Sequence, residues 1–135
     1  MFPSLPVQPS PISQEQAAGM NAVVLAFVGD AVYTLYQRAG LALSSTAKSG
    51  ELHRRAAAEV NAFAQARRME VLLPLLTERE LAVYKRARNS KTANVAKNAD
   101  IADYKKATGM EALIGFLYIS GQNERLKVLL LQNNV

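Results

Sequence analysis

Two acidic side chains stand out because each lies within an otherwise apolar stretch. Asp30 falls inside Asn21–Arg38 (NAVVLAFVGDAVYTLYQR) and Glu111 inside Thr108–Ser120 (TGMEALIGFLYIS). An ionised carboxylate in apolar surroundings costs free energy unless it is paired, hydrogen-bonded or bound to a metal. Each acid could pair with a nearby basic side chain, as buried acids often do. Two such acids in one small core favour a different arrangement, in which the two helices pack together and the carboxylates converge.

Converging carboxylates predict a site for a hard cation. The chain has no cysteine and a single histidine, His53, so thiolate ligands are excluded and a histidine-rich site or a Ser-His-Asp triad is disfavoured. We interpret His53 as a partly exposed helical residue. Oxygen ligands alone suit Mg²⁺. The residues therefore predict Mg²⁺ bound by Asp30 and Glu111.

The net charge of the chain is concentrated in one segment. Between positions 85 and 106 lie seven basic residues, Lys85, Arg86, Arg88, Lys91, Lys97, Lys105 and Lys106. Only Asp100 and Asp103 oppose them, so this segment carries the whole net charge of +5. A solvated surface loop is the usual explanation of such a run, but a concentrated basic segment also suits nucleic acid. Beside a Mg²⁺ site, it indicates metal-assisted phosphodiester hydrolysis.

The spacing of apolar residues predicts one all-α domain, because no stretch alternates as a strand would. Ser13 and Thr77 are predicted to cap helices, and Gly121 is predicted to end one. The first predicted helix begins at Gln14. The next two run from Asn21 to about Gly40 and from Ser49 or Gly50 to Arg67, and a short helix with Pro74 near its end follows. The remaining predicted helices cover 77–88, 100–106, 108–120 and 123–131.

Two further segments are predicted to be irregular. Met1–Ser13 holds four of the five prolines and reads as a flexible arm, which leaves 14–135 as the folded domain. Asn89–Asn98 is polar and is predicted to be an exposed basic loop. No apolar run is long enough to span a bilayer. The start of the chain lacks the features of a secretory signal, which predicts a cytoplasmic protein.

Several motifs in the right order resemble the ribonuclease III family. LAFVGDAVY (25–33) resembles the second half of the family signature, and ATGMEALIGFLYI (107–119) resembles its second acidic motif. LHRRAAAEVNAFAQA (52–66) resembles the helix between them. KRARNSK (85–91) followed by KNAD (97–100) resembles the mini-ribonuclease III branch, which lacks a double-stranded-RNA-binding domain. The resemblance covers roughly residues 21–125.

This resemblance implies a homodimeric, all-helical, Mg²⁺-dependent endoribonuclease. The family cuts double-stranded RNA to leave 5′-phosphate and 3′-hydroxyl ends, and the mini branch trims precursors of large-subunit (23S) ribosomal RNA. The implied partners are double-stranded RNA, a second copy of the chain and a ribosomal protein. Asp30 and Glu111 match the catalytic and metal-binding acids. The predicted RNA-binding residues are Lys85, Arg86, Arg88, Asn89, Lys91, Lys97 and Asn98.

The chain also departs from the family pattern. Ala26, Ser49 and Thr108 stand where full-length members have acids, which leaves the number of metal ions open; Glu51 could contribute a ligand. The missing acids are the best support for a non-catalytic RNA-binding or ribosome-assembly module of the same fold. A basic helical partner of an acidic protein would explain the charge but not the two carboxylates.

Overall fold

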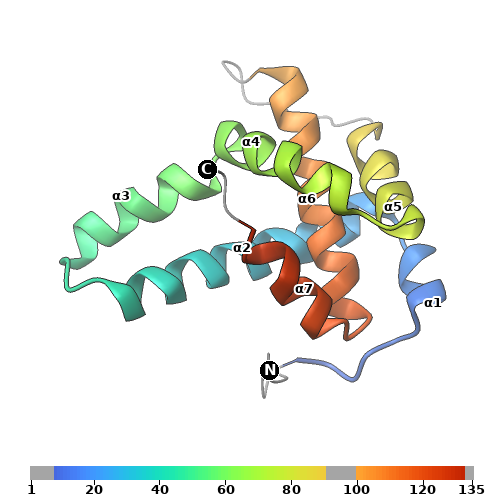
Figure 1. Ribbon diagram of the computed structural model, residues 1–135, viewed down its shortest axis with the longest axis horizontal. Coiled ribbons are helices and arrows are strands. Elements are labelled where there is room, and N and C mark those ends of the chain that lie inside the picture. Colours follow the sequence, from blue (N-terminus) through green and yellow to red (C-terminus); the bar gives the residue numbers. More distant parts are fainter. Residues whose placement is uncertain (1–7, 91–99, 133–135) are drawn as a thin grey trace.

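The computed structural model describes residues 8–90 and 100–132 and shows an all-α protein in these ranges, as predicted (Figure 1). No helix in the described ranges is both long enough and apolar enough to cross a membrane. The elements are α1 (Gln14–Ala18), α2 (Ala22–Ser44), α3 (Ser49–Val60), α4 (Ala62–Leu72), the 3₁₀ turn η1 (Leu73–Leu75), α5 (Glu78–Arg88), α6 (Ile101–Ile119) and α7 (Asn123–Leu130).

Helix α6 lies at the centre of the molecule and crosses α2 in close contact (Figure 1). Two glycines permit this approach. A Cβ on Gly29 would lie 1.6 Å from the carbonyl oxygen of Glu111, and one on Gly115 would lie 2.0 Å from that of Leu25. No other residue type fits such a distance, because a real Cβ would overlap the oxygen. The prediction that these two helices pack together is confirmed.

Helix α6 is continuous, so the prediction of two separate helices over 100–106 and 108–120 is wrong. Asp100 caps its start by accepting hydrogen bonds from the backbone N–H groups of the first turn. Gly109 does not interrupt the helix but makes room for a neighbour, since a Cβ there would lie 2.5 Å from the ring of Tyr84. The helix ends before Gly121, whose positive φ of 69° agrees with its predicted role as terminator.

Helix α2 differs from its prediction in length and in burial. The helix continues through Gly40 to Ser44, because Gly40 keeps a helical backbone. Gly40 does not adopt the positive φ that ends many helices; among the described residues only Gly121 does. Although its sequence is apolar nearly all round, α2 is not buried on every side. Leu25 is fully buried against the core, whereas Phe27, on the opposite face, is 80% exposed. Leu43, near the C-terminal end of the helix, is 90% exposed. Within the described residues, no helix covers this second face.

The single helix predicted over 49–67 is broken at Asn61, which ends α3 and caps α4. The Asn61 side chain accepts a hydrogen bond from the backbone N–H of Ala64 at 2.8 Å and donates to two carbonyls of the last turn of α3. The break turns a different face inward. Gln65 and Met69 are buried, while Phe63 is 61% exposed.

One buried ion pair ties α5 to α7. Thr77 and Glu80 form the predicted capping box, and Glu80 also accepts hydrogen bonds of 2.8 and 2.7 Å from Arg125. Burial raises the pKa of Glu80, but the hydrogen bonds from Arg125 and Thr77 outweigh it and hold the pKa below its ordinary value. The pair therefore favours the ionised carboxylate and fixes α7 beside α5.

The described part of the proline-rich arm contacts the end of α6. The backbone N–H of Ile12 donates to the carbonyl of Ile119 at 3.2 Å, and the Gln8 amide donates to that of Tyr118 at 3.2 Å. Ser13 caps α1 as predicted, together with Gln16 in a capping box.

Candidate active site

Asp30 on α2 and Glu111 on α6 flank the glycine contact, and their carboxyl groups lie within hydrogen-bonding reach of each other. The predicted convergence is therefore present. The two acids differ in environment, since Asp30 is exposed and Glu111 is partly buried. The expectation of a buried acid is wrong for Asp30, because it lies on the edge of α2 that no described helix covers.

The surroundings of Glu111 disfavour its charge. Burial raises its pKa to about 8, helped by the hydrogen bond and the negative charge of Asp30, while a hydrogen bond from Gln65 acts in the opposite direction. Without a cation, Glu111 therefore keeps its proton at neutral pH. A divalent cation between the two carboxylates would replace this repulsion with attraction to both.

The donor set suits one Mg²⁺. The described residues contain no group of three or more acidic or histidine side chains that could hold a metal ion. Mg²⁺ is usually held by one or two carboxylates and completes its shell with water and substrate phosphates. The pair of Asp30 and Glu111, one of them open to solvent, fits that coordination.

The positions of the missing family acids do not add ligands. Ala26 and Thr108 are buried, and the Thr108 hydroxyl donates to the carbonyl of Tyr104 at 3.0 Å. Ser49 begins α3 and lines a hollow of about 220 Å³ that does not include Asp30 or Glu111. Glu51 forms ion pairs with two arginines of its own helix. The described residues thus offer two carboxylates and no third.

Sequence reasoning missed Gln65, whose side chain is buried beside the pair. Gln65 is only 2% exposed, and its Nε2 donates to the carbonyl of Val60 at 2.8 Å. Its side chain acts to lower the pKa of Glu111. In a single continuous helix over 49–67, nothing in the sequence marks this side chain as buried. Asn61 was the available signal, because asparagine is a preferred N-cap residue and marks the start of a new helix.

The predicted RNA-binding residues divide into three groups. Lys85, Arg88 and Asn89 lie at the C-terminal end of α5, where the guanidinium of Arg88 stacks 5.5 Å from the centre of the Tyr84 ring. Arg86 is hydrogen-bonded to the protein itself. Lys91, Lys97 and Asn98 lie outside the described residues.

The guanidinium of Arg86 donates to the carbonyl oxygens of Ala18 and Met20, both at 2.6 Å. These contacts tie α5 to the connection between α1 and α2. Lys106, another member of the basic segment, pairs with Glu70 at 3.3 Å. Two positive charges of the basic segment, those of Arg86 and Lys106, therefore make contacts within the protein.

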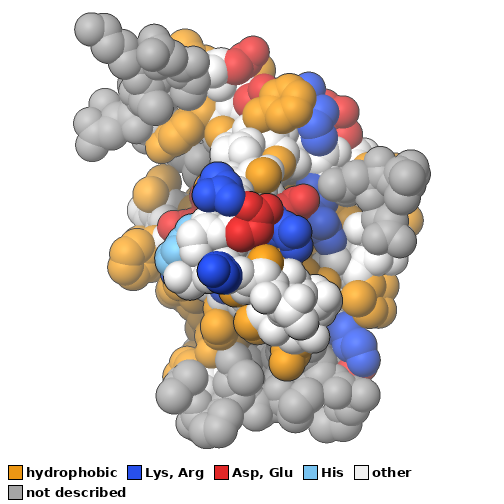
Figure 2. Space-filling model, turned by 90° about the vertical axis from the view of Figure 1, so that its left-hand side faces the viewer, with side chains coloured by type: hydrophobic (Ala, Val, Ile, Leu, Met, Phe, Trp, Pro, Cys, Tyr) orange, Lys and Arg blue, Asp and Glu red, His pale blue; other side chains and the backbone are white. Residues whose placement is uncertain are grey.

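His53 is an exposed residue of α3, as predicted. Figure 2 views the side from which α3 projects and shows this histidine among acidic and basic side chains, with exposed hydrophobic surface around them. Nothing in this arrangement brings His53 to Asp30 or Glu111, so it has no part in the candidate site.

The uncovered face of α2 borders a groove of about 700 Å³, which we call the α2 groove. Its lining is almost entirely apolar and comprises Phe27, Val28, Asp30, Ala31, Val32, Leu35, Tyr36, Ala39, Gly40, Leu43, Tyr118 and Leu130. Asp30 is the one acid among them, so the candidate site lies on the rim of the groove.

The part of the chain that matches known proteins includes both Asp30 and Glu111. A family model described as a ribonuclease III domain matches residues 23–122. A protein named Mini-ribonuclease 3 from Brevibacillus brevis is 50% identical over 106 residues, 78% of this chain and 79% of the relative. One of the same name from Enterococcus faecalis is 45% identical over 82% of this chain and 86% of the relative. A crystal structure of a Fusobacterium nucleatum protein superposes with a TM-score of 0.76 at 30% identity, covering 82% and 89% of the two chains.

The raised pKa of Glu111 makes stability depend on pH. Between its ordinary value of 4.5 and about 8, folded Glu111 holds a proton that the unfolded chain has lost, so stability falls as pH rises. We expect thermal denaturation in EDTA to show this loss in wild type. Glu111→Gln should lack it and exceed wild type at pH 8 by on the order of 2 kcal/mol, allowing for solvent screening at the open site.

Glu59→Gln, at an exposed position of α3, is the matched control and should follow wild type. A pH profile of Glu111→Gln parallel to that of wild type would contradict the environment described for Glu111.

Proposed function

Because the chain belongs to the ribonuclease III family, in its mini-ribonuclease III branch, and is an endoribonuclease, we propose that it cleaves double-stranded RNA with the help of Mg²⁺. The observation that carries this proposal is the meeting of Asp30 and Glu111 at the crossing of α2 and α6. Hydrolysis would leave 5′-phosphate and 3′-hydroxyl ends, as the resemblance implies.

Asp30 and Glu111 would hold the cation. When bound, Mg²⁺ supplies positive charge for the scissile phosphate and activates water for attack. Asp30 is exposed and faces the RNA, whereas Glu111 is partly buried and is held at a fixed distance by the glycine contact. Gln65 favours the ionised form of Glu111, which is the form that binds a cation.

We propose a double-stranded precursor of large-subunit (23S) ribosomal RNA as the natural substrate, which would place the enzyme in the cytoplasm, with a ribosomal protein as an additional partner. The likeness of KRARNSK and KNAD to the mini branch supports this assignment. Recognition would depend on the A-form shape and on 2′-hydroxyls more than on base sequence, because the deep major groove of RNA hides the bases.

The RNA backbone would lie along the end of α5 and the segment that follows it. Lys85 is exposed and Arg88 is partly exposed, and neither forms an ion pair with a described residue. Their charges are available to phosphates, unlike those of Arg86 and Lys106. Asn89, Lys91, Lys97 and Asn98 would extend the same surface.

We propose that a second copy of the chain covers the α2 groove. An almost entirely apolar lining along a helix of 23 residues is costly to leave in water, and a helix face can meet its own copy across a twofold axis. Since Asp30 lies on the rim of the groove, the dimer would carry two sites near its interface, one for each RNA strand.

The first test is cleavage. Asp30→Asn and Glu111→Gln should each reduce the cleavage rate of double-stranded RNA by at least about 100-fold, or about 3 kcal/mol, because each removes half of the charge that holds the cation. RNA binding in EDTA should persist. Glu59→Gln is again the control. Wild-type cleavage by either variant, or cleavage by wild type in EDTA, would contradict the proposed site.

The second test is the salt dependence of RNA binding, measured in EDTA. Lys85→Ala and Arg88→Ala should each lower the slope of log affinity against log salt by roughly 0.7 to 0.9, because each removes one phosphate contact. Arg86→Ala is the informative control, since its bonds to two carbonyls predict a lower melting temperature with little change in slope. Unchanged slopes in the first two variants would place the RNA elsewhere.

The third test is association. Sedimentation equilibrium should give twice the chain mass for wild type, and Leu35→Glu should give monomers because it buries a charge in the apolar interface. Leu35 is 54% exposed in the single chain, so the folded monomer should lose little stability. Ile101→Glu changes an equally exposed residue away from the groove and should stay dimeric. A monomeric wild type would overturn the dimer.

A further inference from the structure

The ring of Tyr84 is packed between α5 and α6. Its side chain is fully buried, and its ring fills the space beside Gly109, where a Cβ would lie 2.5 Å from the ring. The buried Tyr84 hydroxyl has no hydrogen-bond partner among the described residues. The fold therefore fixes this side chain through the packing of its ring and not through its hydroxyl.

The guanidinium of Arg88 is held at two points near this ring, at the C-terminal end of α5. Its Cζ lies 5.5 Å from the centre of the Tyr84 ring, within the range of a cation–π contact. Its Nε donates to Oδ1 of Asn89 at 3.2 Å. The backbone N–H of Asn89 in turn donates to the carbonyl of Lys85 at 2.9 Å. One face and one edge of the guanidinium are therefore fixed by the end of its own helix.

The other edge of the Arg88 guanidinium is free. Of its five N–H donors, the bond to Asn89 uses the one on Nε and leaves the four on the two Nη atoms. Within the described ranges, Arg88 forms no ion pair and its side chain is partly exposed. Two adjacent Nη groups match two oxygens of one phosphate, which is the geometry of a bidentate contact.

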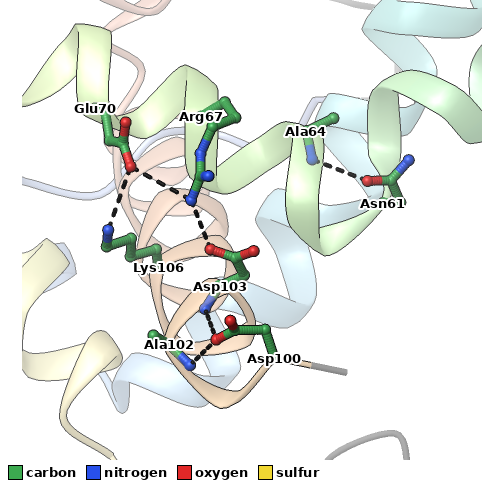
Figure 3. Close-up of polar contacts among 8 residues, drawn as sticks. All are labelled: Asn61, Ala64, Arg67, Glu70, Asp100, Ala102, Asp103 and Lys106. Atoms are coloured by element: carbon green, nitrogen blue, oxygen red, sulfur yellow. Dashed lines mark hydrogen bonds and ion pairs between the residues drawn. The ribbon is translucent and has the colours of Figure 1, made fainter. Parts of the chain in front are cut away.

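Figure 3 shows how the cations of α4 and α6 differ from Arg88. Lys106 pairs with Glu70 at 3.3 Å, and Arg67 pairs with Asp103 at 2.7 Å. The carboxylates beside these two cations weaken their attraction for an anion. Arg88 has no such neighbour in the ion pairs of the described chain, so it is held in place while its charge stays available.

We propose that Tyr84 and Asn89 are positioning residues that present the free edge of Arg88 to a phosphate of double-stranded RNA. The inference rests on the proposed function, because the ligand is the same RNA. It adds a requirement of geometry to the charge of Arg88. A lysine carries the same charge but lacks the planar pair of donors, so it cannot replace Arg88 in this contact.

The first measurement needs no RNA. In the intact free protein, the ¹⁵N–¹H heteronuclear NOE of the Arg88 Nε–H should report an ordered side chain. The comparison is Arg79, which is exposed at the opposite end of α5 and forms no ion pair with a described residue. Asn89→Ala removes the acceptor and should increase the mobility of Arg88. A wild-type Arg88 as mobile as Arg79 would overturn the proposal.

The second measurement is the affinity for double-stranded RNA in EDTA. Arg88→Lys should weaken binding by about 10-fold, the loss expected for one charge-assisted hydrogen bond. The slope of log affinity against log salt should change little, because the charge remains. Arg79→Lys makes the same exchange at the other end of α5 and should bind as wild type. Wild-type affinity in Arg88→Lys would show that charge alone matters and would overturn the proposal.

The third measurement tests Tyr84 through its ring. Tyr84→Phe keeps the ring and removes only the unpartnered hydroxyl, whereas Tyr84→Leu removes the partner of the cation–π contact. Tyr84→Phe should therefore bind RNA more tightly than Tyr84→Leu, and this difference should shrink when Arg88 is already lysine. Equal affinities of the two Tyr84 variants would overturn the role of the ring. If Tyr84→Leu does not fold, the mobility of Arg88 in wild type and in Asn89→Ala decides.

The outcomes separate the two proposals. A wild type that binds and cleaves double-stranded RNA while its free Arg88 is mobile, or while Arg88→Lys binds equally well, would overturn the role of Tyr84 and Asn89 and leave the proposed function standing. A wild type that neither binds nor cleaves this RNA would overturn the proposed function, whatever the order of Arg88 in the free protein.

Discussion

The contact between the backbones of α2 and α6 is the constraint on which the rest of the structure depends. Gly29 and Gly115 each meet a carbonyl of the other helix at a distance that excludes any side chain. This contact places Asp30 beside Glu111, although 80 residues separate them in the sequence. It also makes α6 the centre around which α1, α4, α5 and α7 pack. The geometry of the candidate site and the packing of the core therefore share one origin.

The close crossing of α2 and α6 brings two carboxyl groups together, and their repulsion would favour the binding of a cation. Burial of Glu111, together with the hydrogen bond and the negative charge of Asp30, raises its pKa to about 8, so the two carboxyl groups cannot both ionise cheaply. A bound cation would remove this cost. The electrostatic repulsion that disfavours the two carboxylates without a cation would therefore contribute to metal affinity. The fold can keep such a pair because other contacts, such as that of Glu80 with Arg125, supply stability elsewhere.

Helix α2 combines two roles on its two faces. One face contributes Leu25 and Tyr33 to the core, while the other leaves Phe27 and Leu43 exposed beside the groove. Asp30 lies between these faces. A partner on the open face would bury apolar surface close to the acid, which lowers the local dielectric and strengthens the attraction of the site for a cation. Association and chemistry would thus be coupled through α2.

The sequence alone determined the features that depend on neighbouring residues. Helical periodicity, the caps at Ser13 and Thr77, the end at Gly121 and the two acids in apolar surroundings all follow from hydrogen bonds and spacing within a few residues. The family resemblance added the branch and the activity, which the comparisons support. The non-catalytic alternative is set aside on that ground.

Tertiary structure decided which surfaces are covered, because burial depends on elements far apart in the chain. Local pattern could not show that Gly109 accommodates the Tyr84 ring and leaves α6 unbroken, or that Gln65, beyond the break at Asn61, acts to lower the pKa of Glu111. Nor could it show that Arg86 is held by the carbonyls of Ala18 and Met20. In each case the partner comes from another part of the chain, so only the packed fold brings the two groups together.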